Sequence, residues 1–342
     1  MNATAEATCV YGAKIIQRYL AAMAAEVEGV RTAADIEYVH RMRVATRRMR
    51  TALALFSGCF PKQDYKKIQK DVRKVTRALG EARDLDVQLE VIEAALAEFT
   101  DPKLQPGLKR LKLRLTQRRA EVQQHVEAAM DRMLADQLIE RLENWVKPLL
   151  EQSKTVYLYT PALYQLAFQG IQVRIEELLS HVPYISDPQN VLELHAMRIS
   201  AKRLRYAMET FEELYAGQLK PYITLARKLQ DQLGAIHDLD VWIMMIPQFV
   251  EEEKARIVGY FGNPRPLRRL LPGLEAFRQS RITLREAGYA DFLKEWAKIE
   301  DDQTWDKLLK LINTPLDLEV ALRAREVEAD AGEKPQDNPS VE

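Results

Sequence analysis

The sequence predicts an all-α protein that consists of two related helical halves, and three observations support this. Long stretches are rich in Ala, Leu, Glu, Lys, Arg and Gln, which favour helices, and only 13 of the 342 residues are glycine. Apolar residues recur at helical spacing, and the Asn-Gly and Asp-Gly pairs typical of β-hairpins are absent. Two motifs occur twice in the same order, which indicates an internal duplication.

Glycine and proline residues mark the expected helix ends. Gly80 and Gly234 each follow an apolar stretch, and Pro148 follows a long apolar stretch. We therefore expect a helix to end at each of these three residues. The expected helices are 5–28, 35–57, 62–79, 84–99, 104–146, 161–181, 189–216, 219–233, 238–255, 266–287, 290–299 and 303–313. The duplication divides the chain into halves 1–155 and 156–322, and the acidic, apolar-poor residues 323–342 are expected to form a disordered tail.

The first repeated motif is HRMRVATRRMR at residues 40–50, which recurs 155 residues later as HAMRISAKRLR at 195–205. On a helical wheel, apolar side chains form one arc of each copy, which we expect to be buried. These arcs contain Met42, Ala45, Met49, Ala52, Leu53 and Phe56 in the first copy, and Met197, Leu204, Ala207, Met208 and Phe211 in the second. The opposite side carries a basic stripe of His40, Arg43, Arg47 and Arg50, repeated as His195, Arg198, Lys202 and Arg205, with Arg48 and Arg203 beside the stripes.

The second repeated motif is LGEARDLDV at residues 79–87, which recurs 154 residues later as LGAIHDLDV at 233–241. Its glycine predicts a turn, and Asp84 and Asp238 are placed to cap the helix that would follow. The Asp84/Asp86 and Asp238/Asp240 pairs are also of the type that binds Mg²⁺ or performs acid–base chemistry. Further cations precede each copy in register: Arg73 and Lys74 in the first, and Arg227 and Lys228 in the second.

The basic stripes predict a site for a phosphate polymer. Like charges at three- and four-residue spacing repel each other on an isolated helix, so water, acidic neighbours or an anionic ligand must compensate them. Arginine suits phosphate because it offers several donors in a rigid plane. Lys plus Arg and Asp plus Glu both total 50, so the chain is not a generally basic protein that coats nucleic acid. A purely structural alternative remains, in which the faces are solvated or the motif aspartates pair with the arginines.

Other classes of protein lack support in the sequence. Cys9 and Cys59 are the only cysteines, so we expect no disulfide framework and no metal-type spacing, as in proteins of the reducing cytoplasm. No apolar stretch is long enough to span a membrane. There is no P-loop, dinucleotide fingerprint, nucleophile elbow or metal motif, so we expect no cofactor, no metal site and no catalytic residue.

Together, the two motifs and their duplication resemble the CHAD family, the conserved-histidine α-helical domain, over roughly residues 10 to 315. The resemblance implies two four-helix bundles, related by a pseudo-twofold axis, around a basic central groove or pore that binds inorganic polyphosphate. It also implies that some members are targeted to polyphosphate granules, while the cytoplasmic location that we expect follows from the cysteine usage. The sequence departs from the pattern at Lys202, which replaces an arginine, and at His237, which stands opposite Arg83.

The predicted function is therefore non-catalytic binding of inorganic polyphosphate. The expected binding residues are His40, Arg43, Arg47, Arg48, Arg50, Arg73, Lys74, His195, Arg198, Lys202, Arg203, Arg205, Arg227 and Lys228. The alternatives are a phosphohydrolase or phosphotransferase that uses the four motif aspartates, a nucleic-acid binder, and a helical bundle that binds a protein partner. Nucleic acid is disfavoured because few aromatic residues that could stack on bases interrupt the stripes.

Overall fold

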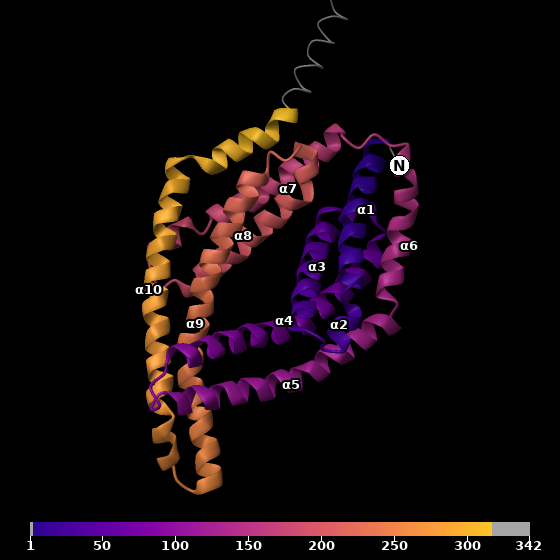
Figure 1. Cartoon of the computed structure of the whole chain (residues 1–342). Coiled ribbons are helices and arrows are strands. Elements are labelled where there is room, and N and C mark those ends of the chain that lie inside the picture. The colour runs from indigo at the N-terminus through magenta and orange to yellow at the C-terminus, as the bar shows by residue number, and fades with distance from the viewer. Residues whose placement is uncertain (1–2, 317–342) are drawn as a thin grey trace, which may run out of the picture.

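The structure, a computed structural model, describes residues 3–316, and within that range it contains helices and no strand (Figure 1). The all-α prediction is confirmed, whereas the expected tail at 323–342 lies outside the described residues. The helices before residue 155 are α1 (Ala3–Ala24), α2 (Val27–Arg31), α3 (Ile36–Leu55), α4 (Lys62–Glu98), α5 (Gln105–Ala135) and α6 (Leu138–Glu151). They are followed by α7 (Pro161–Leu179), α8 (Val191–Phe211), α9 (Lys220–Phe261), α10 (Leu271–Asp301) and a last helix at 304–316. None of the described helices combines the length and apolarity needed to cross a membrane.

The helices pack in a similar order in the two parts of the chain. Helix α3 packs against α1 and α4, and α4 packs against α5, while α8 packs against α7 and α9, and α9 against α10. Helices α4 and α5 extend together across the molecule toward α9 and α10 (Figure 1). Two glycines lie where α5 meets α10. A Cβ atom on Gly107 would lie 2.2 Å from the carbonyl oxygen of Leu270, and a Cβ atom on Gly273 would lie 1.9 Å from the carbonyl oxygen of Leu104. Glycine therefore permits this close backbone approach.

The predicted helix ends at Gly80 and Gly234 are wrong, because both residues lie inside the long helices α4 and α9. A glycine inside a helix costs only about 1 kcal/mol relative to alanine. The burial of apolar side chains on both sides of it, such as Leu79 and Leu85 in α4, outweighs that cost. As a result, Asp84 and Asp238 lie in helix interiors, and the prediction that they cap a helix is also wrong.

Three other helix boundaries differ from the prediction. The expected helix 104–146 is divided into α5 and α6 at Gln137, whose left-handed φ of 49° interrupts the helix. Pro148 lies inside α6 and does not end it. Helix α10 continues through Gly288, where a break between 287 and 290 was expected. Residues 156–160, at the expected boundary between the halves, are not helical.

The two repeated helices bury the predicted apolar arcs. In α3, Met42, Met49 and Leu53 are fully buried, as are Met197 and Met208 in α8. The remaining members of both arcs are also buried.

The repeated phenylalanines bring the two arcs together. The rings of Phe56 and Phe211 lie 6.0 Å apart, and the ring of Tyr11 in α1 lies 6.1 and 6.2 Å from them. The Tyr11 hydroxyl donates a hydrogen bond of 2.9 Å to the Thr210 carbonyl oxygen. These contacts help to hold α3 beside α8.

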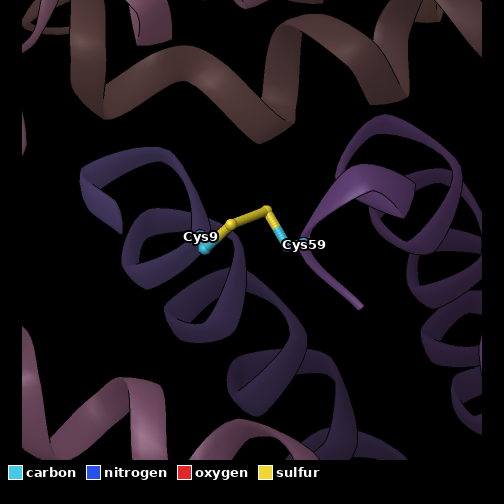
Figure 2. The surroundings of a disulfide bond; sticks show 2 residues. All are labelled: Cys9 and Cys59. Carbon is cyan, nitrogen blue, oxygen red and sulfur yellow. A yellow bond between two sulfur atoms is a disulfide. The ribbon is translucent and has the colours of Figure 1, made fainter. Parts of the chain in front are cut away.

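A disulfide between Cys9 and Cys59 links α1 to the short 3₁₀ turn Ser57–Cys59 after α3 (Figure 2). The Cα atoms of the two residues lie 5.2 Å apart, which is a normal separation for a disulfide. The expectation that the chain has no disulfide is therefore wrong. A pair of cysteines 50 residues apart carries no recognisable signal in a single sequence, because the contact depends on how α1 packs against α3. The cysteine pattern consequently gives no support for a reducing compartment.

Candidate functional site

The two basic stripes meet where α3 and α8 contact each other. Four half-buried cations come together there, and we call them the central cluster: Arg43, Arg47, Arg198 and Lys202. Burial and the positive charges of Arg43 and Arg198 lower the pKa of Arg47 to about 10. Burial and the neighbouring arginines, Arg47 and Arg198 first among them, lower the pKa of Lys202 to about 7. Both shifts arise first from burial and then from repulsion by the neighbouring cations.

Carboxylates do not neutralise the central cluster. Within residues 3–316, Arg47, Arg198 and Lys202 form no ion pair, and Arg43 reaches only Asp84, at 3.4 Å. The Asp84 side chain is 67% exposed, so water screens this contact strongly. The free protein therefore carries an uncompensated charge at the junction of α3 and α8, and a bound anion would relieve the repulsion.

The motif aspartates divide into two groups. Asp86 accepts a hydrogen bond of 2.6 Å from Nε of Arg119 in α5, and Asp240 accepts one of 2.7 Å from Nε of Arg285 in α10. These two buried aspartates pair with arginines outside the stripes, so the structural alternative does not hold for them. Asp84 and Asp238 are exposed and interact electrostatically with each other, and Asp238 also interacts with Arg198. They lie beside the central cluster, on the side of its histidines.

The histidines are uncharged neighbours of the cluster. The ring centroids of His195 and His237 lie 3.9 Å apart, and within the described residues the buried Nδ1 atom of each ring has no hydrogen-bond partner. Burial, followed by the effects of the neighbouring His237 ring and of the positive charge of Arg198, lowers the pKa of His195 to about 4. Burial and Arg83 likewise lower the pKa of His40. A neutral imidazole can still donate one hydrogen bond to a phosphate oxygen.

Metal coordination finds no support at these histidines. Across residues 3–316, no group of three or more His, Cys, Asp or Glu side chains has an arrangement that could hold a metal ion.

The outer cations of the stripes have different environments in the two halves. Arg50 and Arg73 have no ion pair within the described residues. Their equivalents in the second half, Arg205 and Arg227, lie 3.7 and 3.8 Å from Glu209. Arg48 also contacts Glu209, through a 2.9 Å hydrogen bond from its Nε.

Three other predicted binding residues form ion pairs of their own. Arg203 pairs with Glu177, Lys74 lies 3.1 Å from Asp71, and Lys228 lies 2.7 Å from Glu295. Lys74 and Lys228 consequently do not belong to the uncompensated group. Arg203 does contribute positive charge to it, because it helps to lower the pKa values of Arg50 and Lys202.

The prediction of the site omitted three residues that matter to its electrostatics. His237 and Arg83 occupy equivalent positions of the second motif, and each lies beside the histidine of its own half. Their common register in the repeat was the signal that could have identified them. Glu209 had no such signal, because Ala54 occupies the equivalent position in the first half.

The comparisons with known proteins agree with this architecture. The family model of the CHAD domain matches residues 14–247, which is more than half of the chain. The crystal structure of the CHAD domain from the plant Ricinus communis is similar, with 23% identity, a TM-score of 0.55 and coverage of 84% of this chain and 91% of that one. PptA from Streptomyces chartreusis is similar with 15% identity, a TM-score of 0.59 and coverage of 86% of this chain and 99% of that one. No curated protein matches the sequence. With its duplicated motifs, its helical fold and this match, the chain belongs to the CHAD domain family.

Proposed function

We propose that the protein binds inorganic polyphosphate at the central cluster and does not catalyse a reaction on it. The observation that carries this proposal is the set of four cations from α3 and α8 without a neutralising carboxylate, described above. Each half contributes two of them, so a linear anion that lies between the helices would contact both halves at once. Each further contact is nearly intramolecular once the first has formed, which favours a polymer over a single phosphate.

The electrostatics favour polyphosphate over single-stranded nucleic acid. Binding of single strands normally uses exposed aromatic rings on which bases stack. Tyr206 interacts electrostatically with Arg43 and Arg47 of the cluster, and it is only 5% exposed. Its ring lies 4.8 Å from the guanidinium carbon of Arg205 and 5.8 Å from that of Arg48. This ring is therefore not free to stack on a base.

A phosphohydrolase that uses the aspartates is the weaker alternative. Asp86 and Asp240 are buried and each accepts a hydrogen bond from an arginine, Arg119 and Arg285, so neither carboxylate is presented to a substrate at the surface. Asp84 and Asp238 remain near the cluster, but no third ligand joins them within the described residues.

The proposal is tested by titration of the purified protein with long-chain polyphosphate, tripolyphosphate and ATP at two salt concentrations. We expect long-chain polyphosphate to bind far more tightly than ATP. Its affinity should fall steeply with salt, with a slope of log affinity against log salt near −4 for about six neutralised cations. The same samples should release no orthophosphate with Mg²⁺ or Mn²⁺ present.

Substitution of the cluster identifies the site. The Arg47→Gln, Lys202→Gln variant should lose at least about tenfold in affinity for both polyphosphates, since each charge-assisted contact contributes about 1.5–3 kcal/mol. The matched control is Lys298→Gln with Lys307→Gln, which removes two exposed lysines that have no ion pair within residues 3–316. Equal affinities for ATP and long-chain polyphosphate, or equal losses in the two variants, would contradict the proposed function.

A further inference from the structure

The duplication places equivalent arginines on either side of the central cluster, but only on one side do these arginines lie at ion-pair distance from a carboxylate within residues 3–316. Arg205 and Arg227 of the second half both lie near Glu209, which also accepts a hydrogen bond from Arg48. The Glu209 side chain is only 11% exposed, so this carboxylate is held among the three guanidinium groups. The hydrogen bond from Arg48 is charge-assisted. The longer ion-pair contacts of Arg205 and Arg227 reduce the net positive charge around these two arginines, which makes them less attractive to an anionic ligand.

The equivalent positions of the first half lack this carboxylate. Ala54 occupies the place of Glu209. The cations equivalent to Arg205 and Arg227 are Arg50 and Arg73, and neither forms an ion pair within residues 3–316. Burial and the positive charges of Arg73 and Arg203 lower the pKa of Arg50. Uncompensated positive charge therefore continues from the central cluster along α3 and onto α4.

On α4, the positive charge continues into a groove. Arg73 lines a groove of about 700 Å³ between α4, α5 and the start of α6. Lys70 and Arg77, one helical turn on either side of Arg73, also line it and form no ion pair within the described part of the chain. A phosphate chain that passes Arg50 and Arg73 would continue into this groove.

The opposite end of the cluster bears negative charge. Asp84 lies 3.4 Å from Arg43, and Asp238 interacts with Asp84 and Arg198. Both carboxylates are exposed. A phosphate chain directed toward the histidines would meet these like charges. The groove on the side of Arg50 also contains carboxylates, but Asp71 pairs there with Lys74 and Arg141, and Glu81 pairs with Arg118.

We propose that a linear phosphate polymer leaves the central cluster in one direction only, over Arg50 and Arg73 into the groove between α4 and α5, and does not cross the second half. This inference rests on the proposed function and extends it to the path of the chain. A short phosphate such as tripolyphosphate would occupy the central cluster alone. A longer polymer would add the contacts of the first half, so chain-length selectivity would arise from one half of a duplicated protein.

The internal repeat supplies a matched experiment. One variant carries Arg50→Gln and Arg73→Gln, and the other carries the equivalent Arg205→Gln and Arg227→Gln. Both are titrated with long-chain polyphosphate and with tripolyphosphate at several salt concentrations. We expect the first variant to lose about fivefold in affinity for the long chain, and its salt slope to become shallower by about 1.4 because two contacts are lost. The second variant should keep the slope of the unmodified protein, and neither should change tripolyphosphate binding.

The outcomes distinguish this inference from the function on which it rests. Equal losses of long-chain affinity in the two variants, or a larger loss for Arg205→Gln with Arg227→Gln, would overturn the one-sided path while leaving the central cluster as the site. If Arg50→Gln with Arg73→Gln also weakened tripolyphosphate, these arginines would belong to the cluster itself and the path would again be wrong. If the unmodified protein bound neither polyphosphate, both the path and the proposed function would fail. Circular dichroism of each variant checks that the helices remain intact.

Discussion

At the scale of single residues, Lys202 shows how the site differs from an ordinary solvated face. Its ammonium group is half-buried among arginines of both halves, and its pKa falls to about 7. An arginine at this place would stay charged at any physiological pH, whereas this lysine is partly neutral. The replacement of arginine by Lys202 in the second stripe therefore makes part of the site's charge titratable.

Binding of polyphosphate should consequently depend on pH through Lys202. The folded pKa is lowered, so in the free protein the lysine loses its proton above pH 7 while the unfolded chain keeps it up to its ordinary pKa of 10.5. The free energy of unfolding of the free protein should thus increase as the pH rises from about 7 to 10.5, because over this range the unfolded chain binds one proton more than the folded protein. A bound anion favours the charged form, so affinity should fall as the pH rises from 6 to 8, with proton uptake on binding near pH 8.

Calorimetry in buffers of different ionisation enthalpy measures this proton uptake directly. In a Lys202→Arg variant the charge no longer titrates, so both the uptake and the decline of affinity above pH 7 should largely disappear. An unchanged pH profile in this variant would assign the titration to a group other than Lys202.

At the scale of helices, the apolar periodicity of the repeated motifs predicted the buried faces of α3 and α8 because those faces follow from local spacing. Helix ends were predicted less well at glycines. At Gly80 and Gly234 the helix continues because the flanking apolar residues pack against other helices. Helix propensity describes single residues and cannot predict such packing. The left-handed Gln137, by contrast, interrupts a stretch that propensity alone would continue.

The two glycines of the second motif have different surroundings, which gives a matched pair of substitutions. A Cβ on Gly80 would have no neighbour within 4 Å, whereas a Cβ on Gly234 would lie 3.3 Å from Nε of Arg198. Gly80→Ala should stabilise the protein by about 0.5–1 kcal/mol, as expected for alanine in a helix interior, without changing affinity. Gly234→Ala should displace Arg198 and weaken tripolyphosphate binding severalfold.

Denaturant unfolding and titration with tripolyphosphate measure both effects. If Gly234→Ala bound as tightly as Gly80→Ala, Arg198 would not need the space above Gly234 in order to reach the ligand.

At the scale of the whole molecule, the repeat identified most of the cations that converge on the central cluster, because both copies keep the basic spacing. It could not predict which outer arginines are neutralised. That difference depends on Glu209, which lies one helical turn from Arg205 on the same helix but contacts Arg48 of the first half. Such a contact depends on how α3 and α8 pack, so the sequence repeat suggests a symmetry that the charges do not have.

The disulfide is a second feature of the whole molecule that the sequence did not reveal, and it should contribute to stability more than to binding. It closes a segment of 50 residues that includes α2 and all of α3. The chain-entropy account assigns about 4 kcal/mol to a closed loop of this length, because the bond restricts the unfolded chain more than the folded one. The Cys9→Ala, Cys59→Ala variant should therefore unfold at a lower denaturant concentration, with a loss of about 2–4 kcal/mol in the free energy of unfolding.

A reducing agent provides the control for this prediction. It should lower the stability of the unmodified protein to that of the double variant, and it should not affect the variant. Affinity for tripolyphosphate should stay the same in all samples, because the bond joins α1 to the turn after α3 and involves no residue of the central cluster. If the oxidised protein and the variant unfolded at the same denaturant concentration, the bond would not restrict the unfolded chain in the expected way. A loss of binding on reduction would instead mean that the attachment of α1 to this turn helps to hold α3 against α8.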